Sequence, residues 1–377
     1  MHIRSNDSTD PQSALARPNR RTVLRMAGAS VLAAGASTLL SACGDGSSGS
    51  SATGTAAGAA PQPTPFRVAT APGDNYFIDA VNLDQQHYGK YNLEVPKFLH
   101  PSSGVQGMQL QTAGQIDGQM QDTLLTMTTF ANSRPGDRPV IIGMRIPETT
   151  YSIVVNKGQW PSDSASFAEK MASLKGKTVG VTAIGAGADK QLRLALQQAG
   201  MSPGDITPLA VGQTTPAIAQ MSAGKIDAYV GITFATARLM AAQTGGEVLV
   251  DFNTTGVPEL LSKQQVDVLI AREDYAKSNA DACKAWLAAQ WEAKDWILAN
   301  RDEAAELLNS DSFDGRGLDV SKQYIQHFAE DVVPKLQPQW KVTRDAIDLM
   351  IEVAVRTGAV QQGQISYETL VADFARA

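Results

Sequence analysis

The sequence predicts an α/β protein with two similar lobes, each built on a mostly parallel sheet. Short apolar strands alternate with helical stretches from Phe66 onward, an order typical of parallel sheets. The alternation starts again near Lys177, and a motif of the first half recurs about 110 residues later. That spacing indicates two lobes, because solenoid repeats are roughly 20–50 residues long.

The first half is expected to hold four strands and three helices. The strands are expected at 66–70, 93–95, 116–121 and 140–143, and the helices at 75–88, 104–113 and 124–131. In the first helix, Phe77, Ala80, Val81 and Leu83 lie on or near one face, the pattern of an amphipathic helix. This half therefore predicts one complete α/β unit.

The second half repeats the order. A strand at 177–181 enters a glycine loop, and Leu192, Ala195, Leu196 and Ala199 follow at helical spacing. Further strands are expected at 206–211 and 266–271, and the chain beyond is largely helical. The stripe that contains Trp286 and Trp296 predicts core packing.

The repeated motif is Gln111–Gly118, which matches Met221–Ala228. In each copy a helix is expected to end at a glycine, Gly114 or Gly224, in the left-handed conformation that glycine adopts readily. An Ile-Asp pair then opens a strand. The two lobes are therefore expected to share a local design.

The N-terminus has the three-part layout of a secretory signal. Arg20-Arg21 precedes the apolar run 26–40, and the paired arginines resemble a twin-arginine signal. The run is short and rich in Ala, Gly and Ser, so it is a poor membrane span, which needs about 20 apolar residues. Leu40-Ser-Ala-Cys43 resembles a bacterial lipobox, with Cys43 as the lipid acceptor. Residues 1–43 are thus expected to be a signal peptide, and 44–65 a flexible tether of small polar residues.

Composition excludes several function classes. The net charge of −6 argues against nucleic acid as a partner, which favours a basic face. Two cysteines cannot form a disulfide scaffold, and Cys283 is expected to be a small buried apolar residue. The three histidines after the signal lack zinc-ligand spacing, and neither a nucleophile elbow nor a phosphate loop occurs. We therefore expect no metal, cofactor or catalysis.

Several segments, taken in order, resemble periplasmic solute-binding proteins of the sulfonate, taurine and nitrate type (SsuA/THI5-like, NMT1-like). In the first half these are Val68–Thr70, His87–Val95, Ala113–Asp117 and Gln121–Thr123. In the second half they are Leu174–Val179, Leu196–Gly200, Ala223–Ala228 and Val266–Ile270. The resemblance covers roughly residues 66–310.

The resemblance implies a two-lobed, type II periplasmic-binding-protein fold that closes on a ligand. Lobe 1 would comprise 66–148 and the returning segment 266–377, lobe 2 would comprise 149–265, and crossovers would lie near 145–151 and 256–268. It also implies a lipid-anchored, monomeric receptor in the periplasm or at the cell exterior that delivers a small molecule to an ABC permease. Sulfonate-type members often carry a Trp-Asp-Pro-like turn where this chain has Tyr229–Phe234, so sulfonate specificity is not transferred.

Ligands of open parallel sheets bind beyond the carboxyl ends of the strands. Five loops at such positions, together with the expected hinge, supply the candidate ligand-binding residues. They are Asn75, Tyr76, Phe77, Ser102, Ser103, Asp122, Thr123, Arg145, Gly185, Ala186, Gly187, Thr233 and Phe234.

Each candidate has two interpretations. The glycine loop at 185–187 favours an anionic or polar ligand oxygen at a helix start, or is only a tight turn. Asp122 fits a ligand amine or hydroxyl, or a helix cap. Arg145 fits a carboxylate ligand or a surface ion pair, and the aromatic candidates fit a flat ligand or the core.

Two other functions stay open. An enzyme acting on a pyrimidine or thiamine precursor could use the same cleft, although the cysteine cluster of that distant relative is absent. A receptor for a membrane sensor is the other alternative.

Overall fold

Residues 62–232 and 234–377 are described by the structure, a computed structural model. The strands are β1 (Thr64–Pro65), β2 (Val68–Ala69), β3 (Leu93–Glu94), β4 (Gly118–Asp122), β5 (Pro139–Ile146), β6 (Tyr151–Val155), β7 (Thr178–Val181), β8 (Thr207–Ala210), β9 (Ala228–Ile232), β10 (Glu247–Asp251) and β11 (Asp267–Arg272). Arg20, Arg21, Cys43 and Thr233 lie outside the described residues.

The helices fall into two groups along the chain. Those up to the return crossover are α1 (Phe77–Asp84), α2 (His87–Lys90), α3 (Gly104–Thr112), α4 (Thr123–Asn132), α5 (Phe167–Ala172), α6 (Gly187–Gln198), α7 (Thr214–Ser222), α8 (Ala235–Thr244) and α9 (Glu259–Ser262). Those after it are α10 (Glu273–Ser278), α11 (Ala280–Ala299), α12 (Arg301–Phe313), α13 (Leu318–His327), α14 (Arg344–Arg356) and α15 (Tyr367–Leu370). Short 3-10 or π segments lie at η1 (Asp74–Tyr76), η2 (Pro203–Asp205), η3 (Phe328–Val332), η4 (Val333–Lys335), η5 (Pro338–Trp340) and η6 (Asp373–Ala375).

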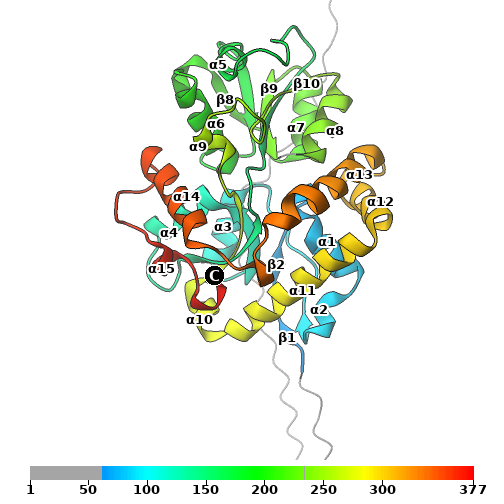
Figure 1. The fold of residues 1–377 in the computed structure, drawn as a ribbon, viewed down its shortest axis with the longest axis vertical. Helices are drawn as coiled ribbons and strands as arrows, with labels where there is room; N and C mark the ends of the chain where they lie inside the picture. Colours follow the sequence, from blue (N-terminus) through cyan, green and yellow to red (C-terminus); the bar gives the residue numbers. More distant parts are fainter. Residues whose placement is uncertain (1–61, 233) are drawn as a thin grey trace, which may run out of the picture. The chain divides into compact units, whose positions relative to one another are not determined.

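Two mixed sheets organise the described chain (Figure 1). The sheet of lobe 1 has the order β2-β4-β11-β5, and the sheet of lobe 2 has the order β10-β6-β9-β7-β8. In lobe 1 only β11 runs against its neighbours, and in lobe 2 only β6 does so. Both strands directly follow a crossover and so enter their sheet from the other lobe. The predicted α/β class with two lobes and mostly parallel sheets is confirmed.

The chain passes between the lobes twice. It leaves lobe 1 after Ile146 and enters lobe 2 at Tyr151, then leaves lobe 2 after Asp251 and returns at Asp267. The two crossovers are joined by a hydrogen bond from Val266 N–H to the Glu148 carbonyl (3.2 Å). Lobe 2 is therefore one continuous segment inserted between two parts of lobe 1.

The helices after β11 complete the core of lobe 1. Trp286 and Ile297 of α11 are buried, as the apolar stripe predicts, whereas Trp296 is only partly buried. Cys283 is buried, as expected for a small apolar residue. Helix α11 packs on α1, α14 packs on α4, and α13 reaches α8 of lobe 2. Apolar burial of this kind stabilises a fold by roughly 25 cal/mol per Å².

The repeated motif has the same structure in both lobes. Gly114 and Gly224 have φ values of +65° and +66°, which confirms the two left-handed helix ends. The following aspartates also share a role, since Asp117 Oδ2 accepts Arg67 N–H and Asp227 Oδ2 accepts Thr178 N–H, both at 2.8 Å. Each aspartate thereby fixes the start of a neighbouring strand.

Some expected elements have different bounds. The helix expected at 75–88 is divided into η1, α1 and α2, because Gln86 takes a left-handed φ of 54°. Thr64 and Pro65, placed in the tether, pair in parallel with Leu93 and Glu94. Strands β6 and β10 were not predicted. Strand β6 is buried at every position and so shows no polar alternation, and β10 is a short edge strand. No helix in 62–232 or 234–377 has the length and apolar character of a membrane crossing.

Candidate functional site

Two carboxylates face each other where the lobes meet. Asp122 ends β4 and Asp267 opens β11, and they are direct partners in the antiparallel ladder, so their side chains share one face of the sheet. They are only 5% and 4% exposed. Burial raises the pKa of Asp122 to about 6, and burial together with the charge of Asp122 raises the pKa of Asp267 to about 7. Like charges this close favour a shared proton or a cation.

Asp122 connects the lobes. Its Oδ1 accepts a hydrogen bond from Leu125 N–H (2.8 Å) and caps α4, and the Tyr151 hydroxyl of lobe 2 donates to its Oδ2 (3.2 Å). Lys190 of α6 lowers the pKa of Asp122 by its charge. The capping role proposed for Asp122 is therefore present, and one of its oxygens faces lobe 2.

Asp267 has fewer partners than its burial requires. Among the described residues its Oδ2 makes no hydrogen bond, and neither do the nearby Asn75 Nδ2 and Thr150 Oγ1. Thr150 and Asn75 nevertheless lower the pKa of Asp267 as hydrogen-bond donors, so they lie close to its carboxylate, although none of these atoms reaches hydrogen-bond geometry. Buried polar groups without partners are costly, and in native structures they call for an explanation. These three groups, from lobe 1 and the first crossover, are therefore candidate ligand contacts.

A third carboxylate binds across the lobes directly. Asp74 of η1 lies at the N-terminus of α8, where its Oδ2 accepts hydrogen bonds from Phe234 N–H and Ala235 N–H, both at 2.7 Å. Its Oδ1 accepts from the Thr236 hydroxyl at 2.6 Å. The first turn of a helix favours negative charge, so Asp74 occupies the position that a ligand anion would take.

The glycine loop of lobe 2 packs against Asp122 at Gly187. Gly185 has a φ of +83° and donates its N–H to Asp189 Oδ2 (2.9 Å). A Cβ at Gly187 would lie 2.2 Å from the Tyr151 hydroxyl and 2.7 Å from Asp122 Cγ. Gly187 is therefore needed for close approach, whereas the left-handed conformation belongs to Gly185.

Arg145 does bind a carboxylate bidentately, but one of its own chain. Its two terminal nitrogens donate to Asp79 Oδ1 and Oδ2 at 2.9 Å each, and Gln290 Nε2 donates to the same carboxylate (2.7 Å). Arg145 and Asp79 are fully buried, so the expectation of a surface pair is wrong. This buried pair lies in lobe 1, where the charge of Arg145 also acts on Asp267.

The other candidates divide between structural and accessible positions. The Thr123 hydroxyl donates to the carbonyls of Gln265 and Val266, both at 2.8 Å, and so holds the second crossover. Ser103 caps α3, and Phe77 is buried in the core. The Phe234 ring stacks on His327 with centroids 4.6 Å apart. Three further candidates remain: Ser102 is exposed, Tyr76 is partly exposed, and Ala186 is buried beside Gly187.

A pocket of about 350 Å³ lies where the first two candidate loops meet. Thr70 and Tyr76 of the first loop line it together with His100 of the second, and His100 Nδ1 lies 3.1 Å from the Thr70 carbonyl oxygen. Burial raises the pKa of Tyr76, and the charges of Asp267 and Asp122 raise it further. Tyr76 lines the pocket, whereas neither Asp122 nor Asp267 does.

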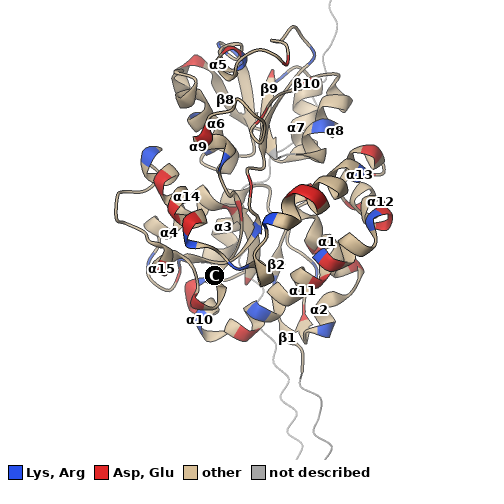
Figure 2. Cartoon of the chain, viewed as in Figure 1, with Lys and Arg blue, Asp and Glu red and all other residues tan. Residues whose placement is uncertain are grey.

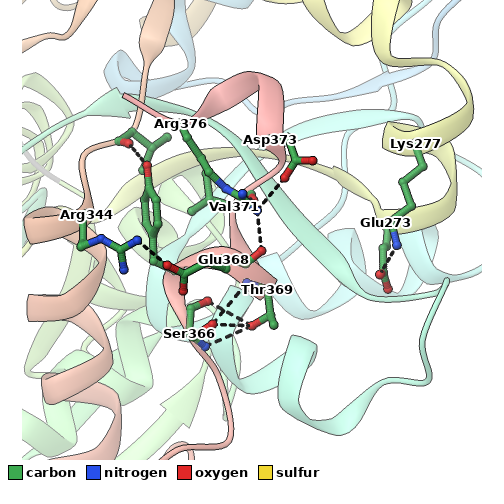
Figure 3. Close-up of polar contacts among 11 residues, drawn as sticks. Glu273, Lys277, Arg344, Ser366, Glu368, Thr369, Val371, Asp373 and Arg376 are labelled. Atoms are coloured by element: carbon green, nitrogen blue, oxygen red, sulfur yellow. Dashed lines mark hydrogen bonds and ion pairs between the residues drawn. The ribbon is translucent and has the colours of Figure 1, made fainter.

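A larger pocket of about 530 Å³ lies near the C-terminus, where Val140 of β5 and Glu273 after β11 line it, at the end of β11 opposite to Asp267. Its three carboxylates are paired, as Figure 3 shows for Glu368 with Arg344, Asp373 with Arg376 and Glu273 with Lys277. None of its described charged side chains is a buried polar group without a partner. The contact between the lobes is therefore the stronger candidate.

Sequence reasoning missed Asp267, Asp74 and Thr150. An isolated Asp at the start of the apolar strand at 266–271 was the available signal for Asp267. Among residues 62–232 and 234–377, no group of three or more His, Cys, Asp or Glu could hold a metal ion. The site therefore consists of carboxylates, hydroxyls, an amide and tyrosines.

Solved structures of binding proteins share this fold. The alkanesulfonate-binding protein SsuA from Xanthomonas axonopodis pv. citri, bound to MOPS, aligns with a TM-score of 0.63 at 17% identity, over 84% of this chain and 100% of that one. The aliphatic sulphonate binding protein SsuA from Escherichia coli gives 0.58 at 20%, over 82% and 97%. The nitrate-binding protein NrtA from Synechocystis PCC 6803 gives 0.55 at 18%, over 82% and 94%.

Sequence comparison identifies the family. Curated binding proteins of Brucella abortus (strain 2308) and Brucella suis biovar 1 are 30% identical over 139 residues, which is 37% of this chain and 42% of their length. The family described as NMT1/THI5 like matches residues 88–304, more than half of the chain. The chain belongs to the NMT1/THI5-like family.

Proposed function

We propose that this protein is the solute-binding component of an ABC-type importer, which captures a small organic molecule or anion between its lobes and delivers it to a permease. The observation that carries the proposal is the set of buried polar groups without partners, Asp267 Oδ2, Asn75 Nδ2 and Thr150 Oγ1, at the meeting of the lobes. A ligand bound there would satisfy these groups and stabilise the arrangement in which the lobes are in contact.

The relatives support a binding role. The solved structures are named as sulfonate- or nitrate-binding proteins, and the curated relatives are named as binding proteins. Each aligned structure matches at 20% identity or less, so its ligand is not assigned to this chain. An importer component without catalysis is the function most consistent with these names and with the site.

The proposal includes the N-terminal segment. Arg20 and Arg21 would direct export, and Cys43 would carry the lipid that anchors the receptor to a membrane, in the periplasm or at the cell exterior. The tether at 44–65 would let a monomeric receptor reach the permease.

The test is a thermal-unfolding screen of the full chain against metabolites of several charge classes. A ligand at 100 times its Kd should stabilise the protein by about 2.7 kcal/mol. Gly187→Val should abolish the shift, and Asp281→Asn, at a fully exposed position, should retain it. Proton NMR of the incubated compound distinguishes binding from catalysis. Absence of any stabilising compound would contradict the proposal, and chemical conversion of a compound would favour the enzyme alternative.

A further inference from the structure

The two helix starts through which lobe 2 could hold an anion are both faced by carboxylates of lobe 1. Asp74 accepts three hydrogen bonds at the start of α8. At the start of α6, a Cβ added to Gly187 would lie only 2.7 Å from Asp122 Cγ. An anionic ligand group would have to displace one of these carboxylates or approach it against charge repulsion.

The carboxylates next to these helix starts are not balanced by paired cations. Arg145 is committed to Asp79 through two hydrogen bonds of 2.9 Å, so that pair is neutral. Lys190 acts on Asp122 through its charge, but no ion pair joins the two among the described residues. Asp122 and Asp267 therefore lie opposite each other without a paired cation, so their ionisation calls for a shared proton or a bound cation. Elsewhere on the described chain, acidic and basic residues are interspersed along the helices (Figure 2).

The orphaned atom of this pair is an acceptor. Asp267 is 4% exposed and its Oδ2 lacks a hydrogen-bond donor among the described residues. An ionised carboxylate only accepts hydrogen bonds, so its natural partner is an N–H or O–H group. Charge-assisted bonds to a cationic donor are about twice as strong as neutral ones.

We propose that the ligand carries a protonated amine, which binds between Asp122 and Asp267 as their missing cation; this rests on the proposed function. The Tyr151 hydroxyl of lobe 2 donates to Asp122 Oδ2 (3.2 Å), so a tyrosine of the other lobe borders this position. Asn75 and Thr150 then supply the remaining hydrogen bonds to the body of the ligand.

The experiment compares matched probes on the full chain. Each set holds an ammonium compound with its neutral and anionic analogues, such as benzylammonium, benzyl alcohol and benzoate, or butylammonium, 1-butanol and butyrate. The sets extend to diamines, guanidinium compounds and alkanesulfonates. Thermal unfolding detects binding, and calorimetry gives Kd. We expect stabilisation by members of the ammonium class, with affinity that rises as the pH increases from 5 to 8 and the two carboxylates ionise.

Variants locate the site. Asp267→Asn keeps the size of the side chain and should lower the affinity for the ammonium probe at least tenfold. Asp281→Asn removes a fully exposed carboxylate and should leave this affinity unchanged. Circular dichroism of each variant without probe verifies folding. Asp122→Asn is a second variant, although it also alters the cap of α4.

Three results would overturn the inference. Binding of anionic or neutral members without their ammonium analogues would assign another ligand class and leave the proposed function intact. Wild-type affinity of the ammonium probe for Asp267→Asn would place the amine elsewhere. Binding of no class by the folded chain would contradict the proposed function itself.

Discussion

Asp74 of lobe 1 accepts a 2.6 Å hydrogen bond from Thr236 of lobe 2, so one lobe caps a helix of the other. Burial raises the pKa of Asp74, while these hydrogen bonds lower it. The carboxylate therefore acts as a fixed substitute for a bound anion and holds the lobes together.

Asp74→Asn should loosen this contact. The amide keeps the size but loses the charge, and its NH₂ group faces the N–H donors of α8. We expect the free energy of unfolding to fall by about 1–3 kcal/mol, and the lobes to separate more in the absence of ligand. Urea unfolding and small-angle scattering measure the two effects. An unchanged radius of gyration together with wild-type stability would show that the contact does not hold the lobes.

The buried Asp79–Arg145 pair should be costly to break. Arg145→Met leaves Asp79 as an uncompensated buried charge, and removal of one partner of such a pair costs about 3–5 kcal/mol. The double variant Asp79→Leu, Arg145→Met should be less destabilised than Arg145→Met alone. The exposed pair Lys263–Glu259 is the control, since surface pairs contribute about 0–1 kcal/mol. Equal losses from Arg145→Met and Lys263→Met would contradict a structural role for the buried pair.

Stability without ligand should decrease as the pH rises from 4 to 7. Burial raises the pKa of Asp122 to about 6 and that of Asp267 to about 7, whereas an unfolded aspartate titrates near about 3.9. Between these values the folded state binds more protons than the unfolded state, so the free energy of unfolding falls with pH. Charges that act on the pair come from Arg145, Lys190 and, at high pH, the tyrosines.

Asp267→Asn should flatten this pH dependence, because the amide does not titrate. Urea unfolding at several pH values, with the wild type alongside, provides the measurement. Asp281→Asn should keep the full slope. A slope that is identical in Asp267→Asn and the wild type would mean that Asp267 is ionised throughout the range.

The glycine loop offers a matched pair of variants. Gly187→Val would place atoms within about 2.2–2.7 Å of Tyr151 and Asp122, and should weaken ligand binding at least tenfold while lobe 2 keeps its helices. Gly185→Ala adds a methyl group to open space but must adopt a φ of +83°, so it should cost about 1 kcal/mol of stability with little effect on affinity. Wild-type affinity of Gly187→Val would reduce the loop to a turn.

Export and anchoring can be tested independently of the ligand. Cys43→Ser should give a precursor that is not lipidated, which fractionation would detect as a loss of membrane association. Replacement of Arg20 and Arg21 by lysine should block export through a route for folded proteins. A Cys43→Ser protein that stays in the membrane fraction would disprove the lipobox, and normal export of the lysine variant would disprove the twin-arginine signal.

The sequence predicted the architecture well because helical periodicity, strand alternation and the repeated Gly-x-Ile-Asp motif are local features. The site was only partly predictable. Asp122 was found because it follows a strand, a property that the sequence displays. Asp267 was missed because its position opposite Asp122 depends on the antiparallel return of β11, which pairs residues 145 apart in the chain.

The partner of Arg145 was also not predictable from the local sequence. Its residue type and place near a crossover suggested a ligand carboxylate, and it does bind a carboxylate. That carboxylate belongs to Asp79, which is 66 residues away. No local pattern distinguishes an arginine that binds a ligand from one that neutralises a buried aspartate.

The position of β11 also bears on how the chain folds. This strand lies between β4 and β5 in the sheet of lobe 1, yet it follows all of lobe 2 in the sequence. Lobe 1 cannot complete its sheet until the ribosome has made residue 272, whereas every strand of lobe 2 is available by residue 251. Contacts between distant residues also form slowly, and segments made first generally fold first during synthesis. Lobe 2 is therefore expected to fold first during translation, and the polar site is assembled last, when β11 brings Asp267 into the sheet.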